Sequence, residues 1–506
     1  MRRRTAAALL VMLLVLGCSG WADSASAGVT IASEADIDRT GVTIGYDASL
    51  GIDEEIAERF PSAETAFYAD VDGIEALRTG KIDVYITDNI MASNALEANP
   101  EGITVLGEVF QAQQVALAMS NSCTIPDFQE KVDRIVREMN ANGEMEEIMD
   151  RWLDDASTAY REIPEAETPE YTLHVGTFGQ LKPYTYYDND RLVGADVELA
   201  RIVALRLNAK IVFETADFAG LLAGLAGGKY DLIASNLFIS EERKEAMSYS
   251  EPYLNADLVY MVRSGSAAGQ SAEGVWQRMA RVVNKCLLQS ERYKMLLRGL
   301  LTTVIITLGA FALGNVLGAL LCRLASGRLR RLAEGYCALL EGLPVTVVLL
   351  ILYYVVFSRS RISGVAVAIL GFGMAEAAVL SGLFELGLRS VSGGEREAAA
   401  ALGFSRAQIF RDIVLPQSAL HILPGWFGEL IALMKGTSVA GFIAVVDLTK
   451  AGDLIRSSTF EAFVPLILVA LLYFALTGLL RLLLKLIQNR LDPKKKTRRL
   501  KGVILR

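Results

Sequence analysis

The distribution of apolar residues divides the chain into two parts. Up to about Lys294, short strand-like runs alternate with amphipathic helix-like stretches. From Gly299 onward there are apolar segments long enough to cross a bilayer core of roughly 30 Å as helices. These segments are 299–322, 336–357, 364–388, 420–445 and 463–488. The pattern predicts an α/β part followed by an all-α transmembrane bundle of five helices.

The α/β part divides into two similar stretches. Residues 29–155 and 171–264 each alternate strand-like and helix-like segments, as in an open α/β sheet. Between them, 156–170 is rich in Pro and Glu, which is typical of a solvated linker. Residues 265–297 combine a flexible linker with an amphipathic basic stretch. That stretch is typical either of a helix on the membrane surface or of a helix packed on the α/β part.

A nearly repeated motif marks the same helix-to-strand step in both stretches. "GKIDVYITDN" and "GKYDLIASN" each follow a Leu-, Ala- and Gly-rich run. The first leads to Asp88, and the second ends in Ser235 and Asn236. Because ligands of such sheets bind outside the carboxyl ends of the strands, these polar residues are candidate ligand contacts.

The net charge of −8 is the sum over parts of the chain that differ in charge. The α/β part is acidic, whereas the final segment 491–506 carries seven Lys or Arg and one Asp. A basic tail directly after an apolar segment marks the cytoplasmic side of a membrane. Since five spans is an odd number, we expect residues 29–297 outside the cytoplasm and the C-terminal end inside it. The predicted location is the inner membrane of a bacterial cell.

Residues 1–28 have the pattern of an export signal, with a charged start and a short apolar core. "ASA" before Gly28 is a signal-peptidase pattern, and "VLGC" ending at Cys18 resembles a lipoprotein box. An uncleaved anchor is a third interpretation. All three place the next segment outside the cytoplasm.

The cysteines, histidines and glycines of the sequence argue against several kinds of site. The five cysteines are scattered, and the two histidines lie far apart. Neither a disulfide framework, a metal site nor a histidine-based catalytic triad is therefore expected. There is no GxxxxGK[ST] motif, so we expect no ATP site of its own, no cofactor and no enzyme activity in this chain. No nucleic-acid partner is expected either.

Four ionisable residues interrupt the apolar segments: Glu341, Glu376, Glu429 and Lys435. Such charges are costly in lipid, so they usually face the bundle interior or a water-filled path. One interpretation is a polar substrate pathway. The other is a structural pair between Glu429 and Lys435, and the sequence favours neither.

The segment 393–419, between the third and fourth spans, has polar ends and an Ala-rich middle. Ala favours helix, and Gly403 suits the turn that ends it, after which a second short helix follows. Such a helix-turn-helix on the cytoplasmic face is typical of a docking element, or of an ordinary connecting helix.

Residues 298–490 resemble the polar-amino-acid branch of ABC importer permeases. Within 393–419, the run Glu397, Ala398, Ala399 with Gly403 four residues on, followed by Ile-x-Leu-Pro, resembles the EAA loop of that family. The resemblance implies that the loop seats in a groove of a cytoplasmic ABC ATPase dimer, which hydrolyses the ATP. Five spans are half a usual pathway, which implies a dimer, most simply a homodimer.

The α/β part resembles extracytoplasmic amino-acid-binding proteins of the periplasmic type, which have two lobes and a ligand cleft between them. Residues 171–264 resemble the first half of that family through "KPYTYYDNDRLVGADVELA" and "ADFAGLLAGLAGGKYDLIASN". Residues 29–155, ending in "NGEMEEIMDRWL", resemble its second half. The swapped order implies one circularly permuted binding domain over 29–264 rather than two complete domains.

The resemblance also implies binding roles. Arg243 matches the carboxylate-binding Arg of the family and Asp88 its ammonium-binding Asp. Phe218 matches a stacking aromatic, and Tyr184 is a candidate second wall. Taken singly, each has a plainer explanation: a surface ion pair, a helix cap or a core aromatic. The positions of Ser235 and Asn236 match residues that touch the ligand backbone.

The turn "DASLGI" departs from the family pattern. Leu50 stands where the family often has Thr, so the backbone N–H groups of Leu50 and Gly51 are the expected donors. Phe178 argues against a cationic ligand side chain, whereas Asp47 argues for one. The identity of the amino acid stays open.

The combined prediction is a two-lobed periplasmic-binding-protein-like α/β domain fused to a permease, which captures a small amino acid and imports it. Two alternatives are a ligand-gated channel of the glutamate-receptor type and an extracytoplasmic dehydratase-like enzyme. Such channels place the pore between the halves of the binding domain, whereas both halves here precede every span. A fused bundle argues against the enzyme.

Overall fold

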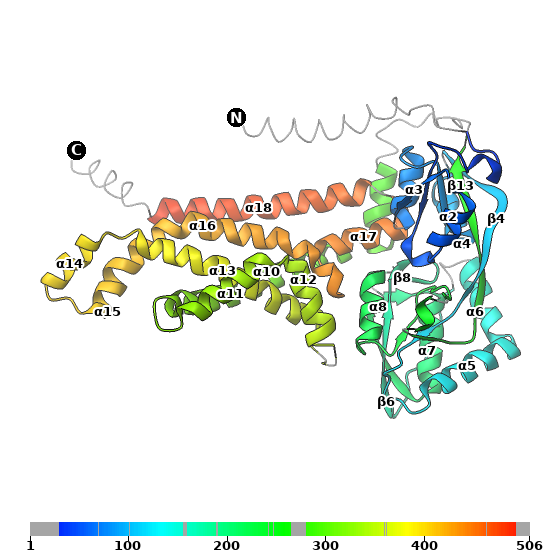
Figure 1. Ribbon diagram of the computed structural model, residues 1–506, viewed down its shortest axis with the longest axis horizontal. Coiled ribbons are helices and arrows are strands. Elements are labelled where there is room, and N and C mark those ends of the chain that lie inside the picture. Colours follow the sequence, from blue (N-terminus) through cyan, green and yellow to red (C-terminus); the bar gives the residue numbers. More distant parts are fainter. Residues whose placement is uncertain are drawn as a thin grey trace.

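The computed structural model has an α/β part at one end of a long helical arm (Figure 1). It describes residues 30–68, 70–100, 102–154, 159–188, 191–240, 242–245, 247–264, 280–358, 360, 362–461 and 463–491. The predicted signal at 1–28, residues 265–279 of the segment 265–297, and the basic tail beyond 491 lie outside the described residues.

The α/β part contains thirteen described strands. They are β1 (Thr43–Tyr46), β2 (Glu64–Phe67), β3 (Val84–Asp88), β4 (Ile103–Val115), β5 (Ala118–Met119), β6 (Tyr171–Thr177), β7 (Gln180–Leu181), β8 (Thr185–Asp188), β9 (Arg191–Val193), β10 (Ala209–Thr215), β11 (Leu232–Ile233), β12 (Ser248–Tyr249) and β13 (Leu254–Arg263). The helices are α2 (Asp53–Arg59), α3 (Asp70–Arg78), α4 (Asn89–Ala98), α5 (Phe128–Asn142), α6 (Glu144–Asp154), α7 (Ala195–Arg206) and α8 (Phe218–Ala226).

Two five-stranded sheets define two lobes. We call lobe 1 the sheet β2-β1-β3-β13-β4 with its helices, and lobe 2 the sheet β10-β6-β11-β5-β12 with its helices. A small third sheet, β7-β8-β9, adjoins lobe 2. The predicted α/β architecture is confirmed.

The lobes do not coincide with the stretches 29–155 and 171–264. Strand β13, from the second stretch, lies between β3 and β4 in lobe 1, and β5, from the first stretch, pairs with β11 and β12 in lobe 2. Helix α6 also packs on lobe 2, where the Arg151 guanidinium and the Trp152 indole N–H bind the Glu198 carboxylate at 2.7 and 2.8 Å. Strand periodicity does not reveal which sheet a strand joins, so the exchange was not visible in the sequence.

The helical arm consists of α10 (Tyr293–Ala325), α11 (Arg330–Gly342), α12 (Val345–Leu350) with π-helical η6 (Ile351–Val356), α13 (Gly364–Arg389), α14 (Gly393–Ala401), α15 (Arg406–Gln408) with η7 (Ile409–Val414), α16 (Leu415–Gly436) with η8 (Thr437–Ile443), α17 (Leu448–Thr459) and α18 (Phe463–Leu491). Helices α10 and α13 cross closely because α10 carries small residues there. A Cβ on Gly314 would lie 2.9 Å from Glu376 Cβ, and one on Gly318 would lie 3.0 Å from the Ala377 carbonyl. Small residues at helix crossings are typical of membrane bundles.

The predicted five spans take a more broken form. Within the described residues, α10, α13 and α18 are single helices long and apolar enough to cross a membrane. Two further candidates are bent pairs, one with a 103° bend after Gly342 and one with a 52° bend between Ile443 and Leu448. Pro344 begins the second member of the first pair with an extended ψ of 130°, which an unbroken helix would not allow.

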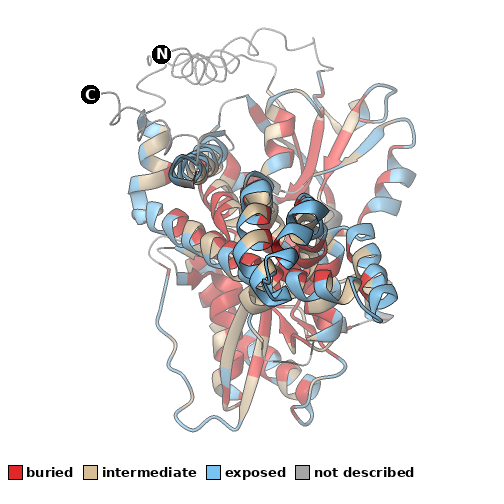
Figure 2. Cartoon of the chain, turned by 90° about the vertical axis from the view of Figure 1, so that its left-hand side faces the viewer, coloured by how far each residue is buried: buried red, intermediate tan, exposed pale blue. Residues whose placement is uncertain are grey.

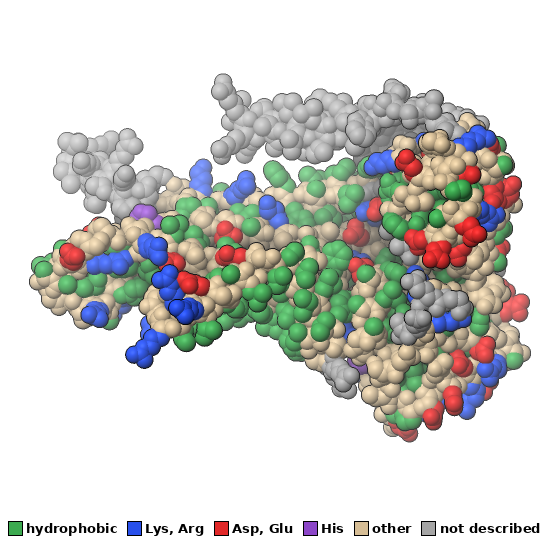
Figure 3. Space-filling model, viewed as in Figure 1, with side chains coloured by type: hydrophobic (Ala, Val, Ile, Leu, Met, Phe, Trp, Pro, Cys, Tyr) green, Lys and Arg blue, Asp and Glu red, His purple; other side chains and the backbone are tan. Residues whose placement is uncertain are grey.

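The outward faces of the arm are exposed and apolar. Figure 2 shows the strands largely buried and the outer sides of the arm helices exposed, and Figure 3 shows hydrophobic side chains along the arm. Exposed examples include Leu301, Val316, Leu332, Phe474 and Leu482. Such a surface is typical of contact with lipid or with another membrane helix.

Candidate ligand-binding cleft

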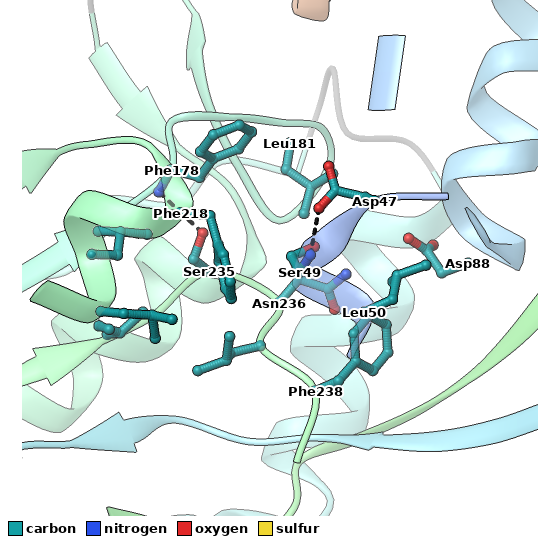
Figure 4. Close-up of a pocket in the computed structure, with 14 residues that line it drawn as sticks. Asp47, Ser49, Leu50, Asp88, Phe178, Leu181, Phe218, Ser235, Asn236 and Phe238 are labelled. Atoms are coloured by element: carbon teal, nitrogen blue, oxygen red, sulfur yellow. Dashed lines mark hydrogen bonds between the residues drawn. The ribbon is translucent and has the colours of Figure 1, made fainter. Parts of the chain in front are cut away.

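A cavity of about 60 Å³ lies between the lobes (Figure 4). Lobe 1 contributes Asp47, Ser49, Leu50 and Asp88, and lobe 2 contributes Phe178, Leu181, Phe218, Leu221, Leu222, Ile233, Ser235, Asn236, Leu237 and Phe238. A single water needs roughly 10–15 Å³, so in this conformation there is room for a ligand of few heavy atoms. Six of the nine predicted binding residues line this one cavity, although they come from distant parts of the chain.

Asp88 ends β3 and caps the next helix. Its Oδ1 accepts the N–H groups of Ile90 at 3.0 Å and Met91 at 2.8 Å, as an N-cap residue of α4 does. The side chain is 4% exposed, and burial raises the pKa of this carboxyl to about 6, while the N–H donors from Met91 and Ile90 act in the opposite direction. Asp88 is therefore a cap residue and a cavity residue at once, and it is ionised at neutral pH.

Arg243 reaches across the cleft from lobe 2. Its Nη1 donates to the Ser49 carbonyl at 2.9 Å, and its guanidinium lies 4.9 Å from the centre of the Phe218 ring. The place where a Cβ on Gly51 would stand is 3.2 Å from Nη2, and Gly51 has a φ of +63°. Arg243 thus joins the lobes at the edge of the cavity, beside an aromatic residue that lines it.

Ser235 and Asn236 follow β11, as the motif predicts. Ser235 Oγ accepts the Phe178 N–H at 3.0 Å, and the Asn236 N–H donates to Asp196. The Asn236 side chain is buried, and its Oδ1 has no hydrogen-bond partner within the described residues. An unpaired buried acceptor beside a cavity is suited to a donor from a ligand.

Asp196 holds the Asn236 turn in place. It is the second residue of α7, is fully buried, and accepts the Tyr253 hydroxyl at 2.8 Å. Burial raises the pKa of its carboxyl to about 7, while the Tyr253 and Asn236 donors lower it. Asp196 was not predicted from the sequence, and its position in an apolar helix, "GADVELA", was the available signal.

The turn at 47–51 differs from its expected role in one respect. Asp47 Oδ1 accepts the Ser49 N–H at 2.7 Å, and the Leu50 N–H donates to the Asp47 carbonyl at 3.1 Å. The Leu50 N–H is therefore already used within the turn, and Leu50 contributes its side chain to the cavity instead. The expectation of a backbone donor stays with Gly51.

Tyr184 is not a wall of the cavity. It is fully buried, and the described residues that line the cavity do not include it. Its backbone packs against Gly194, where a Cβ would stand 2.1 Å from the Tyr184 carbonyl oxygen. Phe178 and Phe238 supply the aromatic walls beside Phe218; Phe238 was missed, although it follows Asn236 by only two residues.

The ionisable residues of the arm separate into two groups. Glu376 is 7% exposed, its Oε1 has no partner within the described residues, and Glu429 lies near enough to interact with its charge. Glu341 and Lys435 are exposed on this single chain. No ion pair between Glu429 and Lys435 occurs in the described part of the arm, so that structural interpretation is not supported.

The segment 393–419 forms the predicted helix-turn-helix at the far end of the arm (Figure 1). Ser392 Oγ accepts the Glu395 N–H at the start of α14, and Gly403 has a φ of +85° in the turn. Glu397 and Ala398 are exposed, whereas Ala399 is buried. The apolar side chains of Leu402, Phe404 and Phe410 are exposed.

Comparison with known proteins connects both parts of the chain to one kind of system. Residues 173–429, half of the chain, match the bacterial extracellular solute-binding proteins, family 3. A probable amino-acid ABC transporter permease protein YckA of Bacillus subtilis is 31% identical over 193 residues, covering 37% of this chain and 85% of its own length. The chain belongs to both families. It is an amino-acid ABC permease with a family 3 solute-binding domain.

Two further similarities are of the same kind. A putative glutamine transport system permease protein GlnP of Rickettsia bellii is 29% identical over 210 residues, which cover 40% of this chain and 95% of the relative. A crystal structure of an amino acid ABC transporter with histidines is 25% identical, covering 43% of this permease and 99% of that chain, with a TM-score of 0.38. The family 3 match and the similarity to YckA confirm the predicted binding-domain and permease resemblances, and the chain is a multi-pass membrane protein.

Proposed function

We propose that the chain is the importer subunit of an amino-acid ABC transporter, in which one polypeptide captures the ligand and carries it across the membrane. Two copies form the pathway, and a separate cytoplasmic ABC ATPase dimer binds the loops at 393–419 and supplies the energy. The α/β part lies outside the cytoplasm and the C-terminal end inside it. The binding domain is circularly permuted. Its chain passes between the two lobes at 115–118 and again at 249–254, and these two crossings form the hinge.

One observation carries this proposal: groups of opposite charge from opposite lobes lie at one small cavity, Asp88 in its wall and Arg243 at its edge. Asp88 belongs to lobe 1 and Arg243 to lobe 2, and both are at the cleft. An amino acid carries an ammonium for Asp88 and Asn236 Oδ1, and a carboxylate for Arg243. A guanidinium has five N–H donors, enough to bind the Ser49 carbonyl and a carboxylate together. A ligand with both charges bridges the lobes and stabilises the closed form.

The cavity walls favour a ligand with a small or neutral side chain. Phe178, Leu181 and Phe218 present apolar surface, and the volume leaves little room beyond the backbone of the ligand. Relatives named as glutamine permeases are consistent with a neutral polar side chain. Among the described residues that line the cavity, Asp47 is the one acidic group besides Asp88.

The proposal is tested on the full chain in lipid nanodiscs. Each of the twenty amino acids is added while thermal unfolding is followed, and at 100 times Kd a ligand stabilises by about 2.7 kcal/mol. We expect one or a few amino acids to raise the Tm, and Arg243→Ala to abolish the shift. Arg137→Ala is the matched control, because Arg137 forms an exposed pair with Glu251 away from the cleft. An Arg243→Ala protein with affinity within threefold of wild type would refute the proposed site.

A further inference from the structure

A second, larger cavity lies between both lobes and α17. Its volume is about 490 Å³, within the range of small-molecule sites. It is lined by Asp47, Phe67, Tyr68, Val71, Asp72, Phe178, Gln180, Asp217, Phe218, Ala219, Lys450, Asp453, Arg456 and Ser457. Asp47, Phe178 and Phe218 line the ligand-binding cleft as well, so the two cavities are neighbours that share one wall.

Helix α17 presents its charged face to this cavity. Asp447 caps the helix, accepting the N–H groups of Thr449 at 3.2 Å and Lys450 at 2.9 Å. Lys450, Asp453 and Arg456 follow at intervals of three, so they share one face of the helix. The same helix face therefore brings two cations and an anion of the permease part to the mouth of the binding domain.

The two cations of α17, Arg456 and Lys450, differ in their bonding partners. Arg456 binds Asp72 of lobe 1 and, through Nη1, Asp453 at 3.2 Å. Lys450 Nζ has no ion pair or hydrogen bond within the described part of the chain, and it lies 5.6 Å from the centre of the Phe178 ring. The carboxylates of Asp453 and Asp217 are near enough to interact with its charge. Lys450 is thus an ammonium that lines a cavity without a direct acceptor.

Asp217 offers the complementary charge. Its Oδ1 accepts the Gly220 N–H at 2.8 Å as the cap of α8, and its other oxygen has no hydrogen-bond partner within the described residues. It directly precedes Phe218, which belongs to the shared wall. A cation and an anion, each with bonding capacity left, therefore line the same space.

We propose that this cavity is a second amino-acid site, a transfer site that the ligand occupies after leaving the cleft. The Lys450 ammonium binds the ligand carboxylate, and Asp217 binds its ammonium. Phe178 and Phe218 form the partition between the two sites, and the ligand passes when the lobes separate. This inference rests on the proposed function and deepens it, because it assigns residues of both the binding domain and the permease to one step.

The charge balance argues against a simple anion as the ligand. Four carboxylates and two cations line the cavity, so a simple anion would meet a surplus of negative charge. A zwitterion brings its own ammonium and is not excluded in this way.

The test is equilibrium dialysis of the full chain in lipid nanodiscs against a ¹⁴C-labelled mixture of the twenty amino acids. We expect wild type to bind two molecules per chain, in a tight and a weak phase. Lys450→Gln is expected to weaken the second phase at least tenfold and to change the affinity of the first less than twofold. Lys450→Arg keeps the charge and retains both phases. A single phase in wild type, or both phases in Lys450→Gln, would overturn the transfer site.

Further variants separate the possible outcomes. Asp217→Asn keeps a capping oxygen for α8 but removes the charge, so it gives the same test if Lys450→Gln does not fold. Lys294→Gln is the matched control, since Lys294 pairs with Glu291 on an exposed surface and lines neither cavity. If Lys450→Gln or Asp217→Asn loses the weak phase and keeps the tight phase, the result supports the transfer site and leaves the cleft unaffected. If wild type binds none of the amino acids, both this inference and the proposed function are overturned.

Discussion

Asp88 shows how one residue serves both the fold and the site. One carboxylate oxygen holds the first turn of α4, while the side chain also lines the cleft. Burial opposes its charge, so the folded protein takes up a proton near pH 6 that the unfolded chain releases near its ordinary value of 3.8. In this range the free energy of unfolding of the empty protein falls as the pH rises, because the folded state binds more protons.

Ligand affinity is expected to depend on pH in the opposite direction. Above pH 6 Asp88 is ionised and attracts the ligand ammonium; below pH 6 it is neutral, so affinity falls as the pH is lowered from 7.5 to 5. Asp88→Asn keeps an oxygen for the α4 cap but carries no charge. We expect it to bind at least tenfold more weakly at pH 7.5.

The measurement is a titration of the full chain at several pH values. The Asp88→Asn profile should be flatter between pH 5 and 7, although Asp196, whose pKa is about 7, can leave a smaller slope. Asp188→Asn, on a strand end that lines neither cavity, is the control. A wild-type affinity that does not change between pH 5 and 7.5 would contradict the role of Asp88.

The sequence predicted which strand ends carry the polar groups, but not every side-chain position. Asp88 ends β3 in lobe 1, and Ser235 and Asn236 follow β11 in lobe 2. All three line the cavity as the sequence predicted, because ligands of such sheets bind outside the carboxyl ends of the strands. Tyr184 was misplaced because an aromatic residue near a site is as easily a core residue, and only the packing against Gly194 decides between them. The use of the Leu50 N–H inside its own turn is a matter of backbone geometry that residue types do not reveal.

At the scale of elements, helices were easier to predict than their breaks. The apolar segments at 299–322, 364–388 and 463–488 correspond to α10, α13 and α18. The segment at 336–357 is also long and apolar enough for a span, yet it bends by 103°, since the hydropathy of a segment does not report its direction. Pro344 was the signal for that bend. Helix α17 was missed because its charged face, which lines the second cavity, lowers its hydropathy.

The helix-turn-helix at 393–419 leads to a prediction about coupling. Leu402 is 78% exposed at the tip of the arm, so it contributes little to the stability of this chain. If the loop seats in a groove of an ATPase, Leu402→Asp places a charge in an apolar contact. We expect a loss of ATP-driven uptake of at least tenfold, with amino-acid binding unchanged.

Uptake is measured in proteoliposomes that contain the chain and its ATPase, and binding is measured on the same preparation. Leu402→Met keeps an apolar side chain and should retain uptake. Uptake within twofold of wild type by Leu402→Asp would argue against this loop as the coupling element. Amino-acid currents without any ATPase would instead favour the channel.

At the scale of the whole molecule, the two lobes meet the arm differently. Lobe 2 shares a hydrophobic cluster with the arm, in which Leu221, Leu225 and Tyr230 pack with Tyr353 and Tyr354. The Tyr353 hydroxyl also donates to Glu214 at 2.5 Å. Lobe 1 meets α17 through the ion pair of Asp72 and Arg456. An apolar contact with a hydrogen bond is fixed, whereas a single ion pair breaks easily, so lobe 1 is the lobe expected to move.

The Asp72–Arg456 pair is therefore expected to affect transport more than stability. Asp72 is 55% exposed, and a pair of this kind contributes about 1 kcal/mol or less. Asp72→Ala should change the Tm of the full chain by at most a few degrees. It should lower ATP-driven uptake several-fold, because lobe 1 then loses its ion pair with α17. Arg456→Ala also removes the contact with Asp453, so it is expected to lower uptake at least as much. The double variant should be no worse than Arg456→Ala, since that variant has already lost the contact with Asp72. Asp38→Ala, on another surface of lobe 1, serves as the control for loss of an exposed carboxylate. Additive losses in the double variant would show that the two residues act separately, and the opening of lobe 1 would then need a different contact with the arm.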